Sequence, residues 1–406
     1  MLQKFMRRFT RSAPPGRGMS PGAALILALG LCCVLFVPRP EPAFAAQPMR
    51  VVYGFDREFP PFTYEDAGGV AVGFEIELVQ AIFHDTGATL VFRPLNWERI
   101  EYELSAGDIN LTSGMIRTRQ REQLYLFSEQ PSFPLQIRLF TKVYNRFPSA
   151  LLLRGQPVSV EQGTYQHRLL QEIGGFNIKP FTRRTDGLRA LFNDEVAAYC
   201  APVQNSYYYI NKLNYGAITT VGTPLGITNM RIAVNRDRGD LKRMVDEGLK
   251  RVRESGEYDR LYRKWFVREL EEGERRILVE AATRAAVPAY APYGKSGRGA
   301  ALLTATGKIY SACTMENADL SLSLSAMRAA VAKAVSEGEF ELRAAVLVDP
   351  KGLILSPGAE DLQTLFEFGR GVLVLMPPDE QKSATSMVVE LLPAPVRRES
   401  SLVPAY

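Results

Sequence analysis

The sequence predicts an α/β protein with more than one domain, and three observations support this. Short apolar segments typical of strands alternate with amphipathic segments typical of helices, a pattern that favours parallel sheets covered by helices. The chain has 406 residues, more than one hydrophobic core usually spans. Apolar residues make up 46% and charged residues 23%, which excludes a disordered, collagen-like or polytopic membrane protein.

The N-terminus has the pattern of an export signal. Basic residues extend to Arg17, an apolar run covers residues 23–37, and small residues surround a cleavage site after Ala45. The run is short for a membrane span of about 20 residues, although an uncleaved anchor remains an alternative. We therefore expect residues 1–45 to be a signal peptide and the protein to be periplasmic, or membrane-anchored if the leader is kept.

Charge and cysteine content narrow the choice of partners. The net charge of +5 comes from the first 45 residues, and the remaining chain is neutral. Binding of nucleic acid rests on clustered Lys and Arg, so we expect no nucleic-acid partner. After the leader only Cys200 and Cys313 remain, and we expect two free thiols because they fall in separate predicted domains.

The first predicted domain begins with alternating elements. We expect strands at 51–54, 89–92 and 109–112, and helices at 73–87 and 97–105. Gly68-Gly69 marks a hairpin turn and Gly107 ends the second helix. Ligands of parallel sheets bind beyond the carboxyl ends of the strands.

Several motifs in one order carry a family resemblance. They are Pro60-Pro61-Phe62, GFEIEL at 73–78, Trp97 in LNWERI, Gly107-Asp108-Ile109, GMIRTRQR at 114–121, EQGTY at 161–165 and the segment 240–266. The chain resembles the periplasmic solute-binding proteins of amino-acid ABC importers, family 3. The resemblance implies a two-lobed type II periplasmic-binding-protein fold that closes on its ligand about two hinge strands.

The resemblance also implies boundaries for this domain. The solute-binding domain would cover 48–270, with lobe 1 at 48–140 and 232–270 and lobe 2 at 143–230. The hinge strands would lie near 137–141 and 231–235.

The ligand pocket follows from the same resemblance. Arg121 matches the residue that holds a ligand carboxylate, since a planar guanidinium donates two parallel hydrogen bonds. Gly163 and Thr164 match a helix N-terminus whose N–H groups hold the same carboxylate, and the carbonyl of Gly114 would accept from a ligand amine. Further candidates, as apolar pocket walls or alternatively as core residues, are Phe62, Tyr64 and Trp97.

One departure from the family pattern affects the expected ligand. In the family, the segment corresponding to 193–202 ends in an aspartate that pairs with the ligand's α-ammonium. Here that place falls on Pro202, or on Ala197 if the register shifts. We expect a small anionic or amino-acid-like solute. Because a buried ammonium without an anion is costly, a carboxylate without an α-amine, such as a keto or aromatic acid, fits better than an ordinary α-amino acid.

The second predicted domain covers 271–396 and is followed by a tail at 397–406. We expect helices at 277–286, 325–338 and 361–368, a hairpin of 299–304 with 308–312, and strands at 344–348, 372–376 and 387–392. This order predicts an α/β/α sandwich.

This part resembles the cytidine deaminases in AYAPY at 289–293, MENA at 315–318, AVSEG at 334–338 and ELLP at 390–393. The family holds zinc with one Cys or His and two further Cys, and a glutamate moves the proton. Here Ser325, Gly358 and Asp361 stand at the ligand positions and Met327 at the glutamate position. Zinc prefers thiolate and imidazole ligands, so we expect a domain without zinc, cofactor or deaminase activity.

The sequence therefore predicts a non-enzymatic exported solute-binding protein that serves an ABC transporter permease or a membrane sensor. We expect the deaminase-like domain to serve assembly or interaction, and a homo-oligomer formed through it is one such assembly. One alternative is a periplasmic lyase or dehydratase, with Glu58, Glu65 or Glu161 as its acid. Nucleoside binding without turnover, and active cytidine deaminase, are further alternatives.

Overall fold

The structure is a computed structural model that describes residues 49–145, 147, 149–294, 297–378, 385–392 and 395–396. The predicted signal peptide at 1–45 and the tail at 397–406 lie outside the described residues. Each helix in the described ranges is too short or too polar to cross a membrane.

The first lobe holds a parallel core of β1, β5 and β6, in which β1 pairs with both neighbours. Its strands are β1 (Arg50–Asp56), β5 (Thr89–Leu95), β6 (Leu111–Ile116) and β7 (Tyr125–Phe127), with a small sheet of β2 (Glu58–Phe59), β3 (Thr63–Glu65) and β4 (Ala71–Val72). Its helices are α3 (Phe74–Phe83), α4 (Trp97–Ala106), α5 (Arg119–Glu122), α9 (Gly239–Glu254) and α10 (Glu257–Phe266).

The second lobe is smaller and has parallel strands of its own. It consists of β9 (Pro157–Glu161), β10 (Asn177–Phe181), β11 (Ala198–Pro202), α6 (Tyr165–Ile173), α7 (Arg184–Phe192), α8 (Val203–Lys212) and the 3-10 turn η2 (Ala150–Leu153). β9 pairs in parallel with both β10 and β11.

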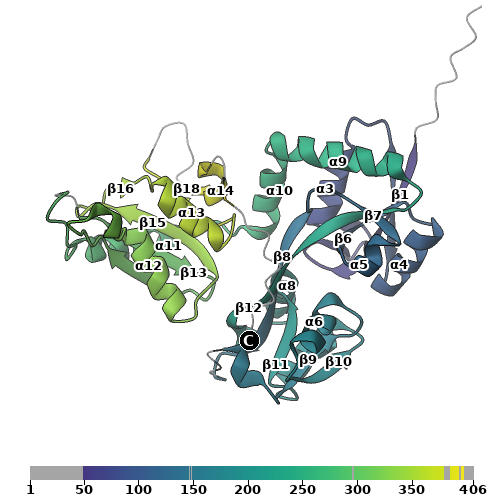
Figure 1. The fold of residues 1–406 in the computed structure, drawn as a ribbon, viewed down its shortest axis with the longest axis horizontal. Coiled ribbons are helices and arrows are strands. Elements are labelled where there is room, and N and C mark those ends of the chain that lie inside the picture. The colour runs from purple at the N-terminus through teal and green to yellow at the C-terminus, as the bar shows by residue number, and fades with distance from the viewer. Residues whose placement is uncertain are drawn as a thin grey trace, which may run out of the picture. The chain divides into compact units, whose positions relative to one another are not determined.

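Two long strands belong to both lobes. β8 (Phe133–Lys142) pairs with β11 of the second lobe, whereas β12 (Ile218–Asn235) pairs with β6 and β7 of the first, and the two pair with each other. The sheet order β10-β9-β11-β8-β12-β6-β1-β5 is therefore continuous through both lobes (Figure 1). The hinges expected near 137–141 and 231–235 fall within these strands, and the two-lobed fold is confirmed.

The C-terminal part is a six-stranded sheet in the order β14-β13-β15-β17-β18, with β16 paired to β15. Its strands are β13 (Gly299–Thr304), β14 (Ile309–Cys313), β15 (Leu342–Val348), β16 (Ile354–Leu355), β17 (Leu373–Leu375) and β18 (Thr385–Met387). Its helices are α11 (Glu272–Ala286), α12 (Ala326–Ser336), α13 (Ala359–Glu367), α14 (Val388–Leu391) and the 3-10 turn η3 (Leu320–Leu322).

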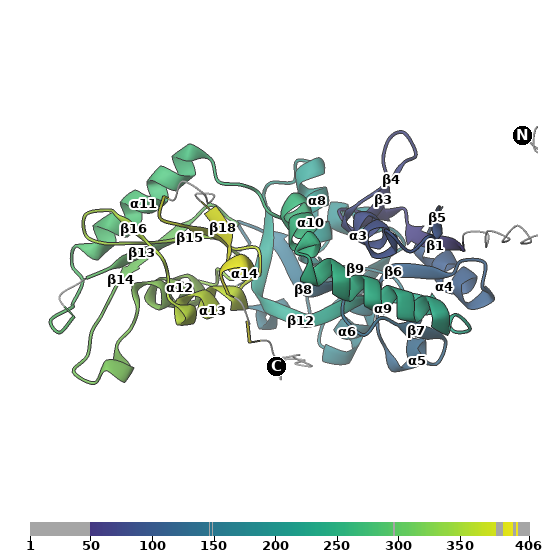
Figure 2. The same cartoon turned by 90° about the horizontal axis from the view of Figure 1, so that it is seen from above.

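Alternating strand residues give this sheet two apolar faces. Ala300 and Leu302 of β13 pack in the cluster that includes α12 and α13, whereas Ala301 and Leu303 pack in the cluster that includes α11. Figure 2 shows α11 on one side of the sheet and α12 with α13 on the other. The expected α/β/α sandwich is confirmed.

Three predicted elements need correction. The strand expected at 387–392 is instead the end of β18 followed by α14, whose Glu390 side chain accepts from the N–H of Met387 at 2.8 Å and so starts a helix. The first helix ends at Phe83 rather than near Gly87, just before Asp85, which has a φ of 63°. The third strand covers Leu111–Ile116 rather than 109–112.

Candidate functional site

A pocket lies between the two lobes at the carboxyl ends of the parallel strands. It has a volume of about 70 Å³ and is lined by Asp56, Phe59, Trp97, Gly114, Ile116, Arg121, Leu135, Glu161, Thr164, Tyr165, Gln166, Arg184 and Pro202. Four residues predicted from the sequence to bind the ligand are thus brought together here: Trp97, Gly114, Arg121 and Thr164. Glu161, predicted as a candidate acid, also lines the pocket.

Arg121 is held in this pocket by the short helix α5, of which it is the third residue. Its backbone N–H donates to Thr118 Oγ1, and its Nη1 donates to the carbonyl of Ile116 at 3.0 Å. Its guanidinium lies 5.4 Å from the centre of the Trp97 ring and forms an ion pair with Glu101. The Arg121 side chain is 8% exposed and that of Glu101 is 38% exposed, so the guanidinium is fixed while its partner reaches solvent.

Thr164 stands at the N-cap of α6 without using its hydroxyl as a cap. Thr164 Oγ1 donates to the carbonyl of Glu161 at 2.7 Å. Gly163 supplies the preceding turn, with a φ of 74°, and its N–H donates to His167 Nδ1. Gly163 does not line the pocket, so its place is in shaping the loop before the helix.

Two predicted walls of the pocket lie elsewhere. Phe62 is fully buried among other aromatic rings, and the centre of its ring lies 4.9 Å from the ring centres of both Phe59 and Phe133. Tyr64 contacts Tyr208 and Trp265 instead. The core alternative is therefore correct for Phe62. The aromatic residue of this segment that lines the pocket is Phe59.

A buried cluster of charged side chains joins the lobes inside the pocket. The sequence analysis named Glu161 as a candidate acid but missed Asp56, Arg184 and the pairing of all three. Arg184 Nη2 lies 3.0 Å from Asp56 Oδ2 and 3.2 Å from Glu161 Oε1. Asp56 ends β1 in one lobe, while Glu161 ends β9 in the other. Both acids thus stand at carboxyl ends of parallel strands, where ligand sites are expected, and this signal could have identified them.

Burial and pairing act against each other in this cluster. Burial raises the pKa of Glu161, and Arg184 only partly offsets it. Burial alone would lower the pKa of Arg184, but the nearby Glu161 and Asp56 carboxylates outweigh it and the pKa is raised. Arg184 therefore remains charged in the cleft.

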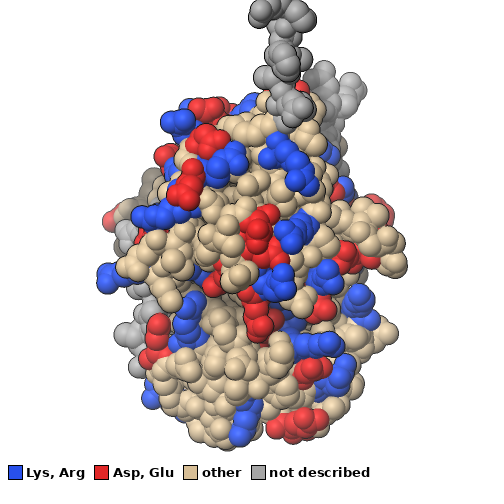
Figure 3. All heavy atoms as spheres, turned by 90° about the vertical axis from the view of Figure 1, so that its right-hand side faces the viewer, with Lys and Arg blue, Asp and Glu red and all other residues tan. Residues whose placement is uncertain are grey.

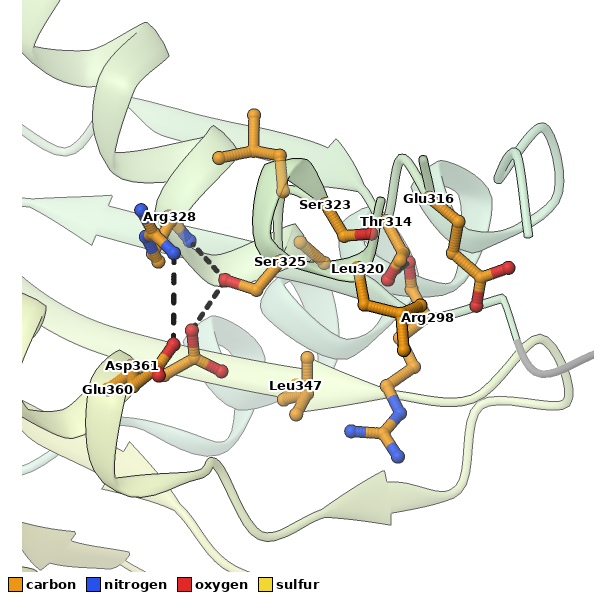
Figure 4. Close-up of a pocket in the computed structure, with 12 residues that line it drawn as sticks. Arg298, Thr314, Glu316, Leu320, Ser323, Ser325, Arg328, Leu347, Glu360 and Asp361 are labelled. Carbon is orange, nitrogen blue, oxygen red and sulfur yellow. Dashed lines mark hydrogen bonds and ion pairs between the residues drawn. The ribbon is translucent and has the colours of Figure 1, made fainter. Parts of the chain in front are cut away.

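A second pocket, of about 350 Å³, lies in the deaminase-like domain (Figure 4). Ser325 Oγ donates to Asp361 Oδ1 at 2.6 Å and accepts from the N–H of Arg328 at 3.1 Å. Burial raises the pKa of Asp361, which the Ser325 hydrogen bond opposes. Glu316 accepts from the N–H groups of Tyr293 and Gly294.

The residues at the family's zinc positions do not fit zinc. Ser325 and Asp361 are bonded to each other, Gly358 is the N-cap of α13, and Met327 is fully buried in the core. This set offers a hydroxyl and a carboxylate, without the thiolate or imidazole that structural and catalytic zinc sites use. Within the described residues, no group of three or more His, Cys, Asp or Glu side chains could hold a metal.

Cys200 and Cys313 are free thiols in the structure. Cys200 is fully buried in β11, and burial raises the pKa of its thiol. Cys313 is partly exposed at the end of β14.

Comparison with known proteins identifies the family. Residues 51–268, more than half of the chain, match the model of the bacterial extracellular solute-binding proteins, family 3. The chain belongs to this family. Residues 251–358 match a second model, the cytidine and deoxycytidylate deaminase zinc-binding region.

Relatives and solved structures agree with this family. The arginine-binding periplasmic protein of Mannheimia haemolytica is 25% identical over 215 residues, covering 51% of this chain and 87% of the relative. The histidine-binding periplasmic protein of Salmonella typhimurium is 27% identical over 261 residues, covering 59% and 96%. The solved arginine-, lysine-, histidine-binding protein ArtJ from Geobacillus stearothermophilus is similar with a TM-score of 0.50 and 26% identity, covering 55% and 97%.

Proposed function

We propose that this solute-binding protein captures a small carboxylate-bearing solute between its lobes in the periplasm and presents it to an ABC transporter permease or a membrane sensor. The observation that carries the proposal is the buried guanidinium of Arg121 inside the pocket between the lobes. Hydrogen bonds to charged groups are worth roughly 1.5–3 kcal/mol each. The half-exposed Glu101 can turn to solvent and leave the guanidinium to a ligand carboxylate.

Three further groups support a carboxylate site beside Arg121: Gly114, Thr164 and the first N–H groups of α6. Gly114 and Thr164 line the pocket from opposite lobes, and the side chain of Thr164 leaves the first N–H groups of α6 uncapped. The N-terminus of a helix favours an anion through these N–H groups and its dipole. A carboxylate would thus be held by both lobes, which couples binding to closure.

The structure offers other acidic side chains that an α-amine of the ligand could meet. Pro202 does line the pocket, but Asp56 and Glu161 supply two carboxylates beside it. An α-ammonium could therefore meet a carboxylate without an aspartate at position 202, in competition with Arg184, which pairs with both acids. Relatives named for arginine and histidine binding make amino acids, together with the matched keto acids, the first solutes to test.

A thermal-shift screen of amino acids, keto acids and nucleosides tests the proposal. A ligand present at one hundred times its Kd stabilises by about 2.7 kcal/mol, which raises Tm by several degrees. We expect Arg121→Ala to abolish the shift and Arg117→Ala to retain it, because Arg117 is exposed and paired with Glu122. A full shift in Arg121→Ala would refute the assigned carboxylate site.

We propose that the deaminase-like domain is catalytically inactive and serves assembly. Large apolar side chains are exposed on one part of it, and such patches often mark interaction sites. They are Val287, Tyr290, Tyr293, Met315, Leu320 and Leu322. The face drawn in Figure 3 belongs to the side of the solute-binding lobes, and there basic and acidic side chains are mixed without a field of one sign.

Light scattering tests the assembly role. We expect the wild type to form a homo-oligomer, and a variant with Leu320→Glu and Leu322→Glu to dissociate without loss of solute binding. A monomeric wild type at micromolar concentration would contradict this role.

The lyase or dehydratase alternative has one supporting observation. Of the three candidate acids, Glu161 lines the pocket, and its pKa is raised by burial. Glu58 and Glu65 do not line it. Recovery of the bound solute unchanged after prolonged incubation with the protein would exclude this alternative.

A further inference from the structure

The guanidinium of Arg184 occupies a position that is built for a cation. One carboxylate from each lobe approaches it, Asp56 from lobe 1 and Glu161 from lobe 2. The face of the Phe59 ring lies 4.9 Å away. Paired carboxylates and an aromatic face are the groups that recognise a guanidinium or ammonium.

The surroundings hold this arrangement in place. The other oxygen of Asp56, Oδ1, accepts from the N–H of Glu58 at 2.9 Å, so its carboxylate cannot rotate freely. The Asp56 and Arg184 side chains are 8% and 10% exposed. The Asp56 carboxylate is therefore fixed in an orientation that faces the buried guanidinium of Arg184, and the position between the two acids holds one cation.

The protein's own side chain therefore fills a large part of the cleft. The open volume is about 70 Å³, whereas pockets for small molecules usually measure roughly 300–1,000 Å³. A long cationic ligand group would need both the space and the two carboxylates that Arg184 uses. It would also meet the charge of Arg184 in a poorly solvated cleft, where like charges repel strongly.

We infer that Arg184 is a specificity-determining residue, which restricts the cleft to small carboxylate-bearing solutes without a cationic side chain. It does so by occupying the cation position between Asp56 and Glu161. As a result, the cleft does not bind arginine or lysine tightly. This inference rests on the proposed function, that the cleft binds a carboxylate at Arg121. It separates the chain from the relatives named for arginine binding.

Calorimetric titration with L-arginine, L-lysine and the best neutral carboxylate from the thermal-shift screen tests the inference. We expect the wild type to bind the neutral solute at least ten-fold more tightly than arginine. Arg184→Ala removes the competing cation, and we expect it to gain at least ten-fold in affinity for arginine. Adding Asp56→Asn to that variant should remove the gain.

A matched control comes from the same helix. Arg189 of α7 is exposed and pairs with Asp186, so Arg189→Ala should bind every solute as the wild type does. A purely structural ion pair at Arg184 would lower stability without creating arginine binding. If Arg184→Ala fails to fold, Arg184→Gln provides the same test, and the wild-type titration stands by itself.

Two results overturn the inference: wild-type protein that binds arginine as tightly as the neutral solute, or a folded Arg184 variant that gains no arginine affinity. Either can occur while Arg121→Ala still abolishes binding of the neutral solute, which leaves the proposed function intact. If no carboxylate-bearing solute binds the wild type or either variant, the proposed function and the inference both fail.

Discussion

Arg138 of β8 forms an ion pair with Glu341, which immediately precedes β15 of the deaminase-like domain, with 3.0 Å between Nη1 and Oε1. The same Glu341 oxygen accepts from Thr220 of β12 at 3.3 Å. Arg138 also donates to the carbonyl of Gly222 and lies over the ring of Phe340. Both strands that connect the lobes thus contact the C-terminal domain through one carboxylate.

A second contact joins this domain to the first lobe. Arg370 forms an ion pair with Asp259 of α10, and its guanidinium lies 4.7 and 5.3 Å from the rings of Tyr258 and Tyr262. The C-terminal domain therefore holds both α10 and the strands shared by the lobes. Its contacts are placed to influence the stability of the solute-binding domain.

Glu341→Ala should destabilise the protein strongly. The Arg138 side chain is 1% exposed, and removing one member of a buried ion pair leaves an unpaired buried charge that costs about 3–5 kcal/mol. Urea unfolding should show a lower midpoint. Adding Arg138→Met should restore part of the lost stability, because it removes the unpaired buried charge.

An exposed ion pair on the surface provides the control for the Glu341→Ala measurement. Glu254→Ala breaks an exposed pair with Lys250, and such pairs contribute about 0.2–1 kcal/mol. If Glu341→Ala changed stability no more than Glu254→Ala, the contact would not join the domains energetically.

The elements that the sequence predicted correctly, and the site residues that the structure also places in the pocket, are those whose evidence lies in neighbouring residues. The turn at Gly107 and the hairpin turn at Gly307 were predictable because glycine adopts a left-handed φ, 82° and 85° here, at little cost. Arg121 was predictable because its motif fixes its place relative to Gly114. The strand expected at 387–392 failed because its apolar residues fit either a strand or a short helix.

Contacts between distant residues lay beyond this reasoning. Asp56 and Arg184 are 128 residues apart, and Arg138 and Glu341 are 203 apart. The position of Asp56 at the end of a strand marks it as a candidate pocket residue. Charged residues are common on protein surfaces, however, so the local sequence does not show which distant residue pairs with which. The proposed ligand specificity and the domain contact both depend on such pairs.

The two thiols should react very differently. Burial raises the pKa of Cys200 and excludes reagents from it, whereas Cys313 is partly exposed, and thiol reactivity requires an accessible thiolate. Iodoacetamide followed by peptide mapping should label Cys313 in the native protein and Cys200 after addition of denaturant. Cys313→Ser should remove the native labelling, and rapid native labelling of Cys200 would contradict the burial.

Cysteines placed at the three family ligand positions should create a zinc site. We expect the wild type to contain no stoichiometric zinc. The triple variant Ser325→Cys, Gly358→Cys and Asp361→Cys should bind about one zinc ion per chain, since three thiolates and a water complete a tetrahedral site. Metal analysis after dialysis measures this. Stoichiometric zinc in the wild type, lost on substitution of Asp361 alone, would show that the present residues hold the metal.

Glu75 should make stability depend on pH. It is fully buried at the start of α3 and accepts from Ser132 Oγ at 2.7 Å. Burial raises its pKa from 4.5 to about 7, although hydrogen bonds from Ser132 and Ser113 and the charge of Arg253 oppose this. The folded protein thus binds a proton that the unfolded chain releases near pH 4.5.

The sign of the effect follows from this difference in bound protons. The contribution of neutral Glu75 is fully present below pH 4.5, declines as the pH rises from 4.5 towards 7, and is lost above about 7. Glu75→Gln cannot ionise and avoids that decline. From pH 5 to pH 8 its stability relative to the wild type should therefore rise, by about 2–3 kcal/mol at one pKa unit per 1.4 kcal/mol.

Urea unfolding of both proteins at pH 5 and pH 8 measures this rise. Glu77→Gln is the matched control, since Glu77 lies on the same helix but forms a pair with exposed Lys264. Its difference from the wild type should change little with pH. A Glu75→Gln difference that is equally constant would mean that Glu75 is ionised in the folded protein, with Arg253 and the two serines outweighing the cost of burial.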